Sequence, residues 1–255
     1  SISLLITGDE EGLAINGTKK VVEYLKKRKE KIDFCIVGEP TNPNKLGEMI
    51  KIGRRGSLSG KIEILGTQGH IAYPHLSNNP INTLVSICKK LKEKKLDKGN
   101  KNFQPSNLEF TAINVDNEAH NVIPARAKAQ FNVRYNNLHN ANTLKKRISS
   151  MVKNICKTNG CKFKIEFIAN GDSFLTRPEK TIFMAKKIIK KITKITPKFS
   201  TTGGTSDARF IRKIAPCLEF GLVNKTMHKV DECVSLNDLK KLTKIYQNIL
   251  QDYFK

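Results

Sequence analysis

The sequence predicts an α/β fold in which a domain built on a mostly parallel sheet is interrupted by an inserted α+β domain. Two observations predict this fold. At both ends of the chain, residues 1–55 and 171–255, apolar runs of strand length are separated by helical patterns. In the middle, residues 56–170, the strands alternate polar and apolar side chains, as strands with one exposed face do. The 255 residues are enough for two domains of ordinary size.

The first part of the chain has the order strand, helix, strand, strand. Residues 2–7 form an apolar run that we expect to be a buried strand, and Thr18 is expected to cap a helix extending to about residue 29. Short apolar strands are expected at 34–37 and 49–52. This order favours parallel pairing. Because the sequence opens at Ser1 inside a strand pattern, we expect the N-terminal part of this domain to be missing.

The inserted region has the order strand, helix, two strands, helix, strand. Such an order forms a compact antiparallel sheet with two helices on one face. Asn79 and Pro80 open the first helix, since proline suits the first helical turn. The strands are expected near 57–64, 107–114, 125–135 and 163–168, and the helices near 79–91 and 144–155.

The last part of the chain returns to the style of the first. Helices are expected near 179–194 and from about 206, followed by a buried strand at 216–220. The final helix is expected at 236–253, with Ser235 and Asp238 at its N-terminal cap. This part therefore completes the domain that the inserted region interrupts.

The net charge of +23 comes mainly from lysines, such as Lys186, Lys187, Lys190 and Lys191. They occupy outward positions between apolar residues, which favours solvated helix faces over nucleic-acid contact. No apolar run approaches the roughly 18–20 residues of a membrane span. The chain is therefore predicted to bind neither nucleic acid nor a membrane, and its charge is expected to steer a small anionic substrate.

The six cysteines do not have the spacing of a metal site. Cys156 and Cys161 lie close in sequence, but no further Cys or His completes a ligand set around them. Most of the others lie in apolar patterns, where a thiol acts as a small buried hydrophobic group. We expect reduced thiols and a cytoplasmic protein.

Acidic residues follow two of the expected strands. Glu10 and Glu11 come after the first strand, and Glu39 follows the second. Ligand sites in open α/β sheets lie outside the carboxyl ends of strands. With His228, from the loop after the strand at 216–220, these residues form a plausible zinc ligand set. The alternative is that the acidic pair lies in a solvated turn and that His228 is an ordinary loop residue.

Six motifs, taken together, make the chain resemble the metallopeptidase and deacylase family of carboxypeptidases, aminoacylase and acetylornithine deacetylase. Their order and spacing fit along the whole chain. The resemblance implies a zinc-peptidase-like catalytic domain interrupted by a dimerisation (lid) domain. The motifs are Thr7-Gly-Asp-Glu-Glu-Gly12, Val37-Gly-Glu-Pro-Thr41, Gly53-Arg-Arg-Gly-Ser57, Gly69-His-Ile-Ala-Tyr-Pro-His75, Asn121-Val-Ile-Pro124 and Ser200-Thr-Thr-Gly-Gly-Thr-Ser-Asp207.

The resemblance implies amide hydrolysis assisted by two zinc ions, for which cobalt can substitute. Glu10 would be the general base that takes a proton from the attacking water and passes it to the leaving amine. Glu11 and His228 would bind one zinc ion and Glu39 the other.

The resemblance also implies a set of substrate-binding residues. Arg54 can grip a carboxylate bidentately, as lysine cannot. The glycines before Thr205 are expected to lead into a helix N-terminus that favours an anion, the alternative being a tight turn. Residues expected to contact the substrate from the catalytic domain and its border are Arg54, Ser57, Gly204, Thr205 and Asn224.

Residues 56–170 resemble the family's dimerisation lid, so a homodimer is implied. His70 would reach the active site of the partner subunit and stabilise the oxyanion. Tyr73, Asn121 and Arg134 would contact the substrate from the lid. The remaining histidines, His75, His120 and His139, are interpreted as surface or loop residues.

The family pattern begins upstream with a His-x-Asp motif and a metal-bridging aspartate, neither of which occurs here. With so few ligands, we expect the chain alone to hold zinc weakly and to hydrolyse amides negligibly. Leu4, Ile6 and Ile36 are expected to be exposed, because the strands that would cover them are missing. The open alternatives are an acetylornithine-deacetylase-like or other deacylase or carboxypeptidase, a non-catalytic dimerisation module, and a basic nucleic-acid binder.

Overall fold

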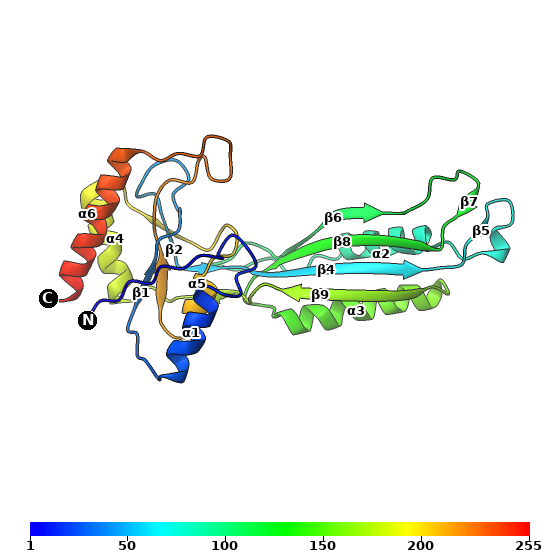
Figure 1. The fold of residues 1–255 in the computed structure, drawn as a ribbon, viewed down its shortest axis with the longest axis horizontal. Coiled ribbons are helices and arrows are strands. Elements are labelled where there is room, and N and C mark those ends of the chain that lie inside the picture. The colour runs from blue at the N-terminus through cyan, green and yellow to red at the C-terminus, as the bar shows by residue number, and fades with distance from the viewer. The chain divides into compact units, whose positions relative to one another are not determined.

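The computed structural model describes all residues from 1 to 255, and contacts divide the chain into two compact units. Unit 1 comprises residues 1–54 and 174–255, and unit 2 comprises residues 55–173. The predicted boundaries lay at 55/56 and 170/171. Figure 1 shows the helices and strands of each unit.

Unit 1 contains a mixed four-stranded sheet in the order β1-β12-β2-β11. β1 runs parallel to β12 and β11 parallel to β2, while β12 and β2 meet in an antiparallel pair through Glu219 and Lys51. The predicted α/β class and parallel pairing are thus confirmed. The strands are β1 (Cys35–Val37), β2 (Met49–Lys51), β11 (Lys198–Ser200) and β12 (Cys217–Glu219), with a short ribbon of β3 (Gly53–Arg54) and β10 (Phe174–Leu175).

Four helices complete unit 1. Helices α4 (Lys180–Thr193) and α6 (Leu236–Tyr253) lie side by side and enclose a core with the sheet (Figure 1). Ile50, Ile189 and Ile245 are fully buried there. Helices α1 (Thr18–Lys27) and α5 (Ala208–Ile211) pack against each other around a second, smaller core. The residue capping α1 is Gly17, and Thr18 is the first helical residue.

The strand predicted at residues 2–7 is absent, so this prediction was wrong. The segment has no regular secondary structure, and no strand of the chain pairs with it. Because a strand forms only when a neighbour satisfies its backbone N–H and C=O groups, an apolar run alone does not make one. The side chains of Leu4 and Ile6 are 86% and 82% exposed, as expected, while Ile36 is half-buried.

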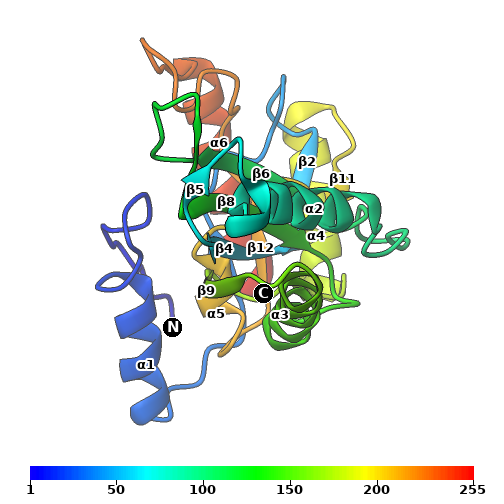
Figure 2. The same cartoon turned by 90° about the vertical axis from the view of Figure 1, so that its right-hand side faces the viewer.

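Unit 2 is built on an antiparallel sheet in the order β6-β8-β4-β9. Helices α2 and α3 pack against each other and against this sheet, so that one apolar core forms between them (Figure 2). The predicted layout is confirmed. The elements are β4 (Gly56–Leu65), α2 (Pro80–Glu93), β6 (Asn107–Asn114), β8 (Arg126–Tyr135), α3 (Ala141–Thr158) and β9 (Lys162–Ala169).

The alternating pattern of β4 explains its place in unit 2. Leu58 and Ile62 are buried against the helices, while Lys61 between them is exposed. Gly60 lies on the buried face of β4, where the absence of a side chain leaves room for an aromatic ring. A Cβ atom at Gly60 would lie 2.1 Å from the ring of Phe131. The start of α2 is stabilised by its N-terminal cap, because the Asn79 side chain accepts a hydrogen bond from the backbone N–H of Ile81.

The shortest elements of unit 2 were not predicted. Two-residue strands and single helical turns contain too few positions to show a period. The short elements are β5 (Gly69–His70), which pairs with β7 (Val122–Ile123), and the 3-10 helix η1 (Pro74–Leu76).

None of the helices in either unit is long and apolar enough to cross a membrane.

Candidate active site

The loop that carries Glu10 and Glu11 is organised by its neighbour Asp9. The Asp9 carboxylate accepts hydrogen bonds from the backbone N–H groups of Ile15, at 2.6 Å, and Asn16, at 2.8 Å. These bonds, the largest effect coming from Asn16, lower the pKa of Asp9. Asp9 has a positive φ of 70°, which turns the chain sharply before the two glutamates. Asp9 therefore shapes the loop, and Glu10 and Glu11 are available for chemistry.

Two predicted ligands of one metal ion lie next to each other. Nε2 of His228 is 3.8 Å from Oε2 of Glu11, although the two residues are far apart in sequence. Both side chains are largely exposed. The loop of His228 is closed by Thr226, whose hydroxyl bonds the backbone N and O of Cys233 at 3.1 and 2.9 Å. The structure thus brings together a carboxylate and an imidazole that suit a divalent cation.

Glu39 and Glu10 share an acidic neighbourhood. Burial, followed by the charges of Glu219 and Glu10, raises the pKa of Glu39 to about 7. Burial, followed by the charges of Glu11 and Asp207, raises the pKa of Glu10. We call Glu10, Glu39, Asp207 and Glu219 the acidic cluster. Carboxylates in such a cluster repel one another, so a cation bound among them would be strongly favoured.

The donor chemistry of this region fits a divalent metal ion, although the residues do not form a closed site. Oδ1 of Asp207 is buried and has no hydrogen-bond partner, and Glu39 holds its proton unusually tightly. A cation would relieve both conditions. No three His, Cys, Asp or Glu side chains, however, lie close enough together to hold a metal ion. Oxygen and nitrogen donors of the right kind are present, but only Glu11 and His228 form a close pair.

Arg54 is buried and bound to Glu219. Its Nε lies 3.0 and 2.9 Å from the two carboxylate oxygens of Glu219, and its Nη2 pairs with the same carboxylate. Its Nη1 donates to the carbonyl oxygens of Thr202, at 3.4 Å, and Gly204, at 3.3 Å. A Cβ at Gly203, which has a φ of 104°, would lie 2.5 Å from this Nη1. Arg54 thus holds the loop through Gly204, and its predicted contact with substrate stays a prediction.

Three charged residues of this region were not predicted from the sequence, namely Lys51, Asp207 and Glu219. Lys51 donates to the hydroxyls of Ser200, at 3.2 Å, and Thr202, at 2.6 Å. Burial, with a further effect of Arg54, lowers the pKa of Lys51 to about 8. The available signal was that Lys51 and Glu219 stand inside short apolar strands, where a charge needs a partner.

Of the remaining predicted substrate residues of unit 1, Gly204 and Thr205 belong to this loop and Asn224 lies beside the segment that follows β1. Gly204 is exposed, with open space beside its Cα. Thr205 is half-buried, and the Asn224 side chain donates to the carbonyl of Pro40 at 3.3 Å. The expected anion site at a helix N-terminus is wrong, since α5 is a single turn of four residues and its cap is the carboxylate Asp207.

The residues predicted on the lid side fall into two groups within unit 2. The first group lies at the ribbon of β5 and β7 (Figure 1). His70 accepts a hydrogen bond at Nδ1 from the backbone of Ala72, which leaves its exposed Nε2 as the donor of the neutral ring. The rings of His70 and Tyr73 are 5.9 Å apart. The carbonyl of Asn121 accepts a hydrogen bond from Ile71 at 3.0 Å.

The second group lies on the sheet face away from α2 and α3. Arg134 on β8 is opposite Ser57 on β4. Nη1 of Arg134 and Nε of the nearby Arg55 are buried without hydrogen-bond partners. Burial, followed by the charge of Arg55, lowers the pKa of Arg134. Neither arginine forms an ion pair, so two guanidinium groups lie near each other without a carboxylate.

The interpretation of His139 as a surface or loop residue needs refinement. His139 lies in a loop, as expected, but its side chain is only 15% exposed. Its Nε2 is 3.0 Å from a carboxylate oxygen of Asp97, so it belongs to a buried polar network of unit 2.

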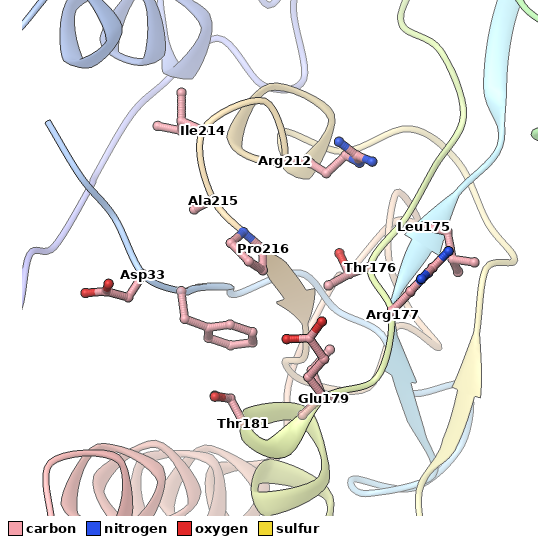
Figure 3. Close-up of a pocket in the computed structure, with 12 residues that line it drawn as sticks. Asp33, Leu175, Thr176, Arg177, Glu179, Thr181, Arg212, Ile214, Ala215 and Pro216 are labelled. Atoms are coloured by element: carbon pink, nitrogen blue, oxygen red, sulfur yellow. The ribbon is translucent and has the colours of Figure 1, made fainter. Parts of the chain in front are cut away.

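A cavity of about 510 Å³ in unit 1 lies away from the acidic cluster. It opens beside Pro216, at the amino end of β12 (Figure 3). Phe34, at the amino end of β1, also lines it, whereas Glu39 and Glu219 lie at the carboxyl ends of these strands. Arg177 and Glu179 also line it. None of the predicted site residues lines this cavity.

Comparison with known proteins places the chain among relatives. Residues 52–159 match the family model described as a peptidase dimerisation domain. The chain is 66% identical over 254 residues to the succinyl-diaminopimelate desuccinylase of Pelagibacter ubique, and 50% identical over 255 residues to that of Methylobacterium radiotolerans. The chain belongs to the same family as these proteins. All of this chain is matched, but only 66% and 65% of the two family members' lengths are.

Solved structures support the fold of this family member. Aminopeptidase PepT from Bacillus cereus matches with a TM-score of 0.80 and 18% identity, covering 98% of this chain and 64% of that one. The M20 family metallo-carboxypeptidase Sso-CP2 from Sulfolobus solfataricus matches with a TM-score of 0.72 and 16% identity, covering 95% and 68%. At such identities the likeness shows the fold alone. The expected zinc-peptidase-like fold with a dimerisation domain is confirmed.

Proposed function

We propose that the chain is part of a metal-dependent amide hydrolase that converts N-succinyl-LL-2,6-diaminopimelate to succinate and LL-2,6-diaminopimelate. This reaction would serve lysine and peptidoglycan precursor synthesis in the cytoplasm. The observation that carries the proposal is the approach of Glu11 and His228 to 3.8 Å beside a loop that also carries Glu10. The desuccinylase names of relatives that match the whole chain support the substrate.

In this proposal Glu11 and His228 would hold one divalent cation and Glu39 a second. The ions, zinc with cobalt as a substitute, supply Lewis acidity when bound. Glu10 takes a proton from the attacking water and returns it to the leaving amine. Its pKa, raised chiefly by burial, makes Glu10 a stronger base than an exposed glutamate. The half-buried position of Glu39, within electrostatic reach of other carboxylates, supports its role as a ligand.

His70 would donate from Nε2 to the oxygen of the amide carbonyl as negative charge develops there. The bond from Ala72 to Nδ1 supports this role, because it leaves the proton of the neutral ring on Nε2. In the assembly this histidine would serve the active site of the partner subunit. Tyr73 and Asn121, at the same ribbon of unit 2, would contact the bound substrate.

Substrate carboxylates would be recognised by arginine. Arg134, with the neighbouring Arg55 and Ser57, is supported by guanidinium nitrogens that are buried without partners and by the lack of any acid beside them. In unit 1, Gly204 faces open space at the loop that Arg54 fixes, and Thr205 beside it is half-buried. Arg54 and Asn224 would complete the contacts from that side.

We also propose a homodimer formed through residues 56–170. The match to a peptidase dimerisation domain supports it. The edge strand β6 is unpaired on one side, and beside it Val85 and Ile113 are 59% and 58% exposed along an apolar groove. Unpaired strand edges with apolar neighbours favour association with another chain.

The metal site is tested by calorimetric titration of the chain with zinc and with cobalt. We expect weak binding, because no three donors lie close enough together to hold the ion. His228→Ala should reduce the affinity further, about 10-fold or more. His120→Ala, which replaces an exposed histidine of unit 2, is the control and should leave the affinity unchanged. Equal affinities for all three proteins would argue against the proposed ligand.

The reaction is tested by measuring succinate release from N-succinyl-LL-2,6-diaminopimelate. The chain should be inactive alone and active when completed with the third of the Pelagibacter ubique relative that has no counterpart in it. Glu10→Gln in the completed protein should reduce kcat about 100-fold or more. Faster hydrolysis of N-acetylornithine than of the succinyl substrate would instead indicate an acetyl-specific deacylase, and no hydrolysis at all would indicate a dimerisation module.

A further inference from the structure

The loop that follows β11 is held by side chains rather than by regular secondary structure. It comprises residues 201–206 and carries Gly204 and Thr205, the proposed substrate contacts, and no helix or strand includes it. Gly204 has open space beside its Cα. Because consecutive glycines increase the freedom of the backbone, such a loop needs contacts from other segments to keep one conformation.

Lys51 supplies such contacts at the start of the loop. It is the last residue of β2 and lies opposite Ser200, the last residue of β11, in the parallel pair. Its Nζ donates to the hydroxyls of Thr202, at 2.6 Å, and Ser200, at 3.2 Å. The two hydroxyls bond each other at 2.9 Å, and the backbone N–H of Thr202 donates to Oγ of Ser200 at 3.2 Å. These bonds form a closed ring that fixes Thr202, the residue directly before the two glycines.

The other end of the loop is bound to Glu219. Oγ of Ser206 donates to the carboxylate of Glu219 at 2.8 Å, and Nε of Arg54 donates to both oxygens of the same carboxylate. Nη1 of Arg54 donates to the carbonyl oxygens of Thr202 and Gly204 within the loop. The loop is thus held at both ends by buried side chains of the sheet.

The position of Lys51 is unfavourable for the stability of the fold. The residue is only 5% exposed, and its ammonium group forms no ion pair. Glu219 lies opposite it in the pair of β12 and β2, but the carboxylate of Glu219 is bound to Arg54. Burial accordingly lowers the pKa of Lys51. A buried charge whose hydrogen bonds go to the start of this loop indicates a role at the loop rather than in the core.

We propose that Lys51 is a positioning residue for substrate binding. Its bonds to Thr202 and Ser200 hold the loop in the conformation that binds the substrate. The inference rests on the proposed function. In this role Lys51 touches neither the substrate nor the reacting atoms, so its loss should weaken substrate binding and leave the chemical step unchanged.

The test measures KM and kcat for succinate release by the completed protein, in which the chain is joined to the third of the Pelagibacter ubique relative that has no counterpart in it. Lys51→Met keeps a long side chain and removes the charge and the donors. We expect KM to rise about 10-fold and kcat to change less than about 2-fold. The control Lys31→Met, the same change at an exposed position of unit 1, should leave both constants unchanged.

A second variant tests the contact from its other side. Thr202→Val keeps the shape of the side chain and removes the oxygen that accepts the shorter bond from Lys51. KM should rise by a similar factor, and a protein with both substitutions should show little more than either single effect, because each breaks the same contact. Effects on KM that multiply in the double variant would overturn the proposed contact.

Thermal unfolding at pH 7 separates positioning from a purely structural role. Lys51→Met should melt at the temperature of the wild type or higher, because it removes a buried charge. A higher KM in a protein of equal or greater stability is therefore the expected combination. A lower Tm with an unchanged KM, or a lower kcat with an unchanged KM, would overturn the inference.

The outcomes also separate this inference from the proposed function. If the completed wild type releases succinate and both Lys51→Met and Thr202→Val keep its KM, the inference alone fails. If the completed wild type folds but does not hydrolyse the succinyl substrate, the proposed function fails and the role of Lys51 fails with it.

Discussion

Each unit contains an aspartate whose side chain the fold largely covers, and the hydrogen bonds of the two carboxylates differ. In unit 2, Asp97 accepts hydrogen bonds from the side chain of Asn136 at 2.7 Å and the backbone of Gly99 at 2.6 Å, and it contacts His139 at 3.0 Å. In unit 1, Asp207 leaves one oxygen without any donor. The comparison teaches that burial alone does not fix the hydrogen bonds of an acid, since the fold supplies several donors to Asp97 and none to one oxygen of Asp207.

The same contrast runs through the rest of the two units. Unit 2 has long paired strands and one continuous core. Unit 1 has short strands, two smaller cores and an exposed apolar segment at residues 2–6. Four substitutions, two in each unit, test these differences between the units.

The largest effect is expected from Phe131→Ala in unit 2. The ring is buried against Gly60 and contacts Phe110 and Phe167, so its removal leaves a cavity. We expect a loss of about 3 to 5 kcal/mol in the free energy of unfolding of unit 2. Hydrogen exchange of the β4 and β8 amides measures it. The control Phe183→Ala removes a half-exposed ring of unit 1, and equal losses in unit 2 from both variants would contradict this account.

The next effect concerns the buried charge of Lys51 in unit 1. Its pKa of about 8 in the folded state lies below 10.5, so the unfolded state binds more protons between these values. The wild type should therefore gain stability as the pH rises from 8 towards 10.5. Relative to Lys51→Met, the gain should be about 2 to 3 kcal/mol between pH 7 and pH 10 in urea unfolding.

The matched control for Lys51 is Lys31→Met, an exposed position of unit 1. The difference between wild type and this control should stay constant over the same pH range. Ser200 and Thr202 bond each other at 2.9 Å, so both keep a partner when Lys51 is replaced. If the difference in free energy of unfolding between wild type and Lys51→Met did not change with pH, burying the charge of Lys51 would cost no stability.

A smaller effect of opposite origin is expected for Asp97 in unit 2. Burial raises the pKa of Asp97, but hydrogen bonds, the largest from Ser106, outweigh burial and bring it to about 2. Because this lies below the unfolded value of 3.8, the stabilisation is present above pH 3.8 and lost as the pH falls towards 2. Asp97→Asn should cost about 2 kcal/mol at pH 7.

The measurement for Asp97 is urea unfolding at pH 7 and at pH 2.5. The gap between wild type and Asp97→Asn should shrink at the lower pH, while the gap for Asp116→Asn, an exposed acid of unit 2, should stay near zero. A gap that grows on acidification would reverse the sign and contradict the assigned network.

The smallest effect is expected from Leu4→Ser in unit 1. The side chain is 86% exposed, so the free energy of unfolding should change by less than about 0.5 kcal/mol. Leu58→Ser in unit 2, where the leucine is fully buried, is the comparison and should cost several-fold more. Thermal unfolding measures both, and a large loss from Leu4→Ser would mean that residues 2–6 pack against the chain.

How far the sequence predicted the fold differs between the units for a physical reason. The long strands of unit 2 were predicted within a residue or two, because an exposed face and a buried face impose a period of two. Residues 2–7 were predicted wrongly, because the apolar run does not reveal whether a neighbouring strand exists to pair with it.

The candidate site was predicted in part. Glu11 and His228 were expected together through a family resemblance, and the structure brings them to 3.8 Å. Asp207 and Glu219 were not predicted as site residues. From the sequence alone, a charged residue in a glycine-rich loop or a three-residue strand is expected to be solvated, and only the fold shows that these two are buried. Which oxygen lacks a partner depends on contacts from distant segments, so spacing along the chain could not reveal it.

The loop closed by Thr226 and Cys233 offers a way to watch this site. Cys233 is the only exposed cysteine, whereas burial raises the pKa of the partly covered Cys35 and Cys88 and so suppresses their reactive thiolate forms. A fluorescent maleimide should therefore attach selectively to the loop that carries His228. Any ordering of that imidazole would then be visible as a change in emission, without a substrate or a turnover.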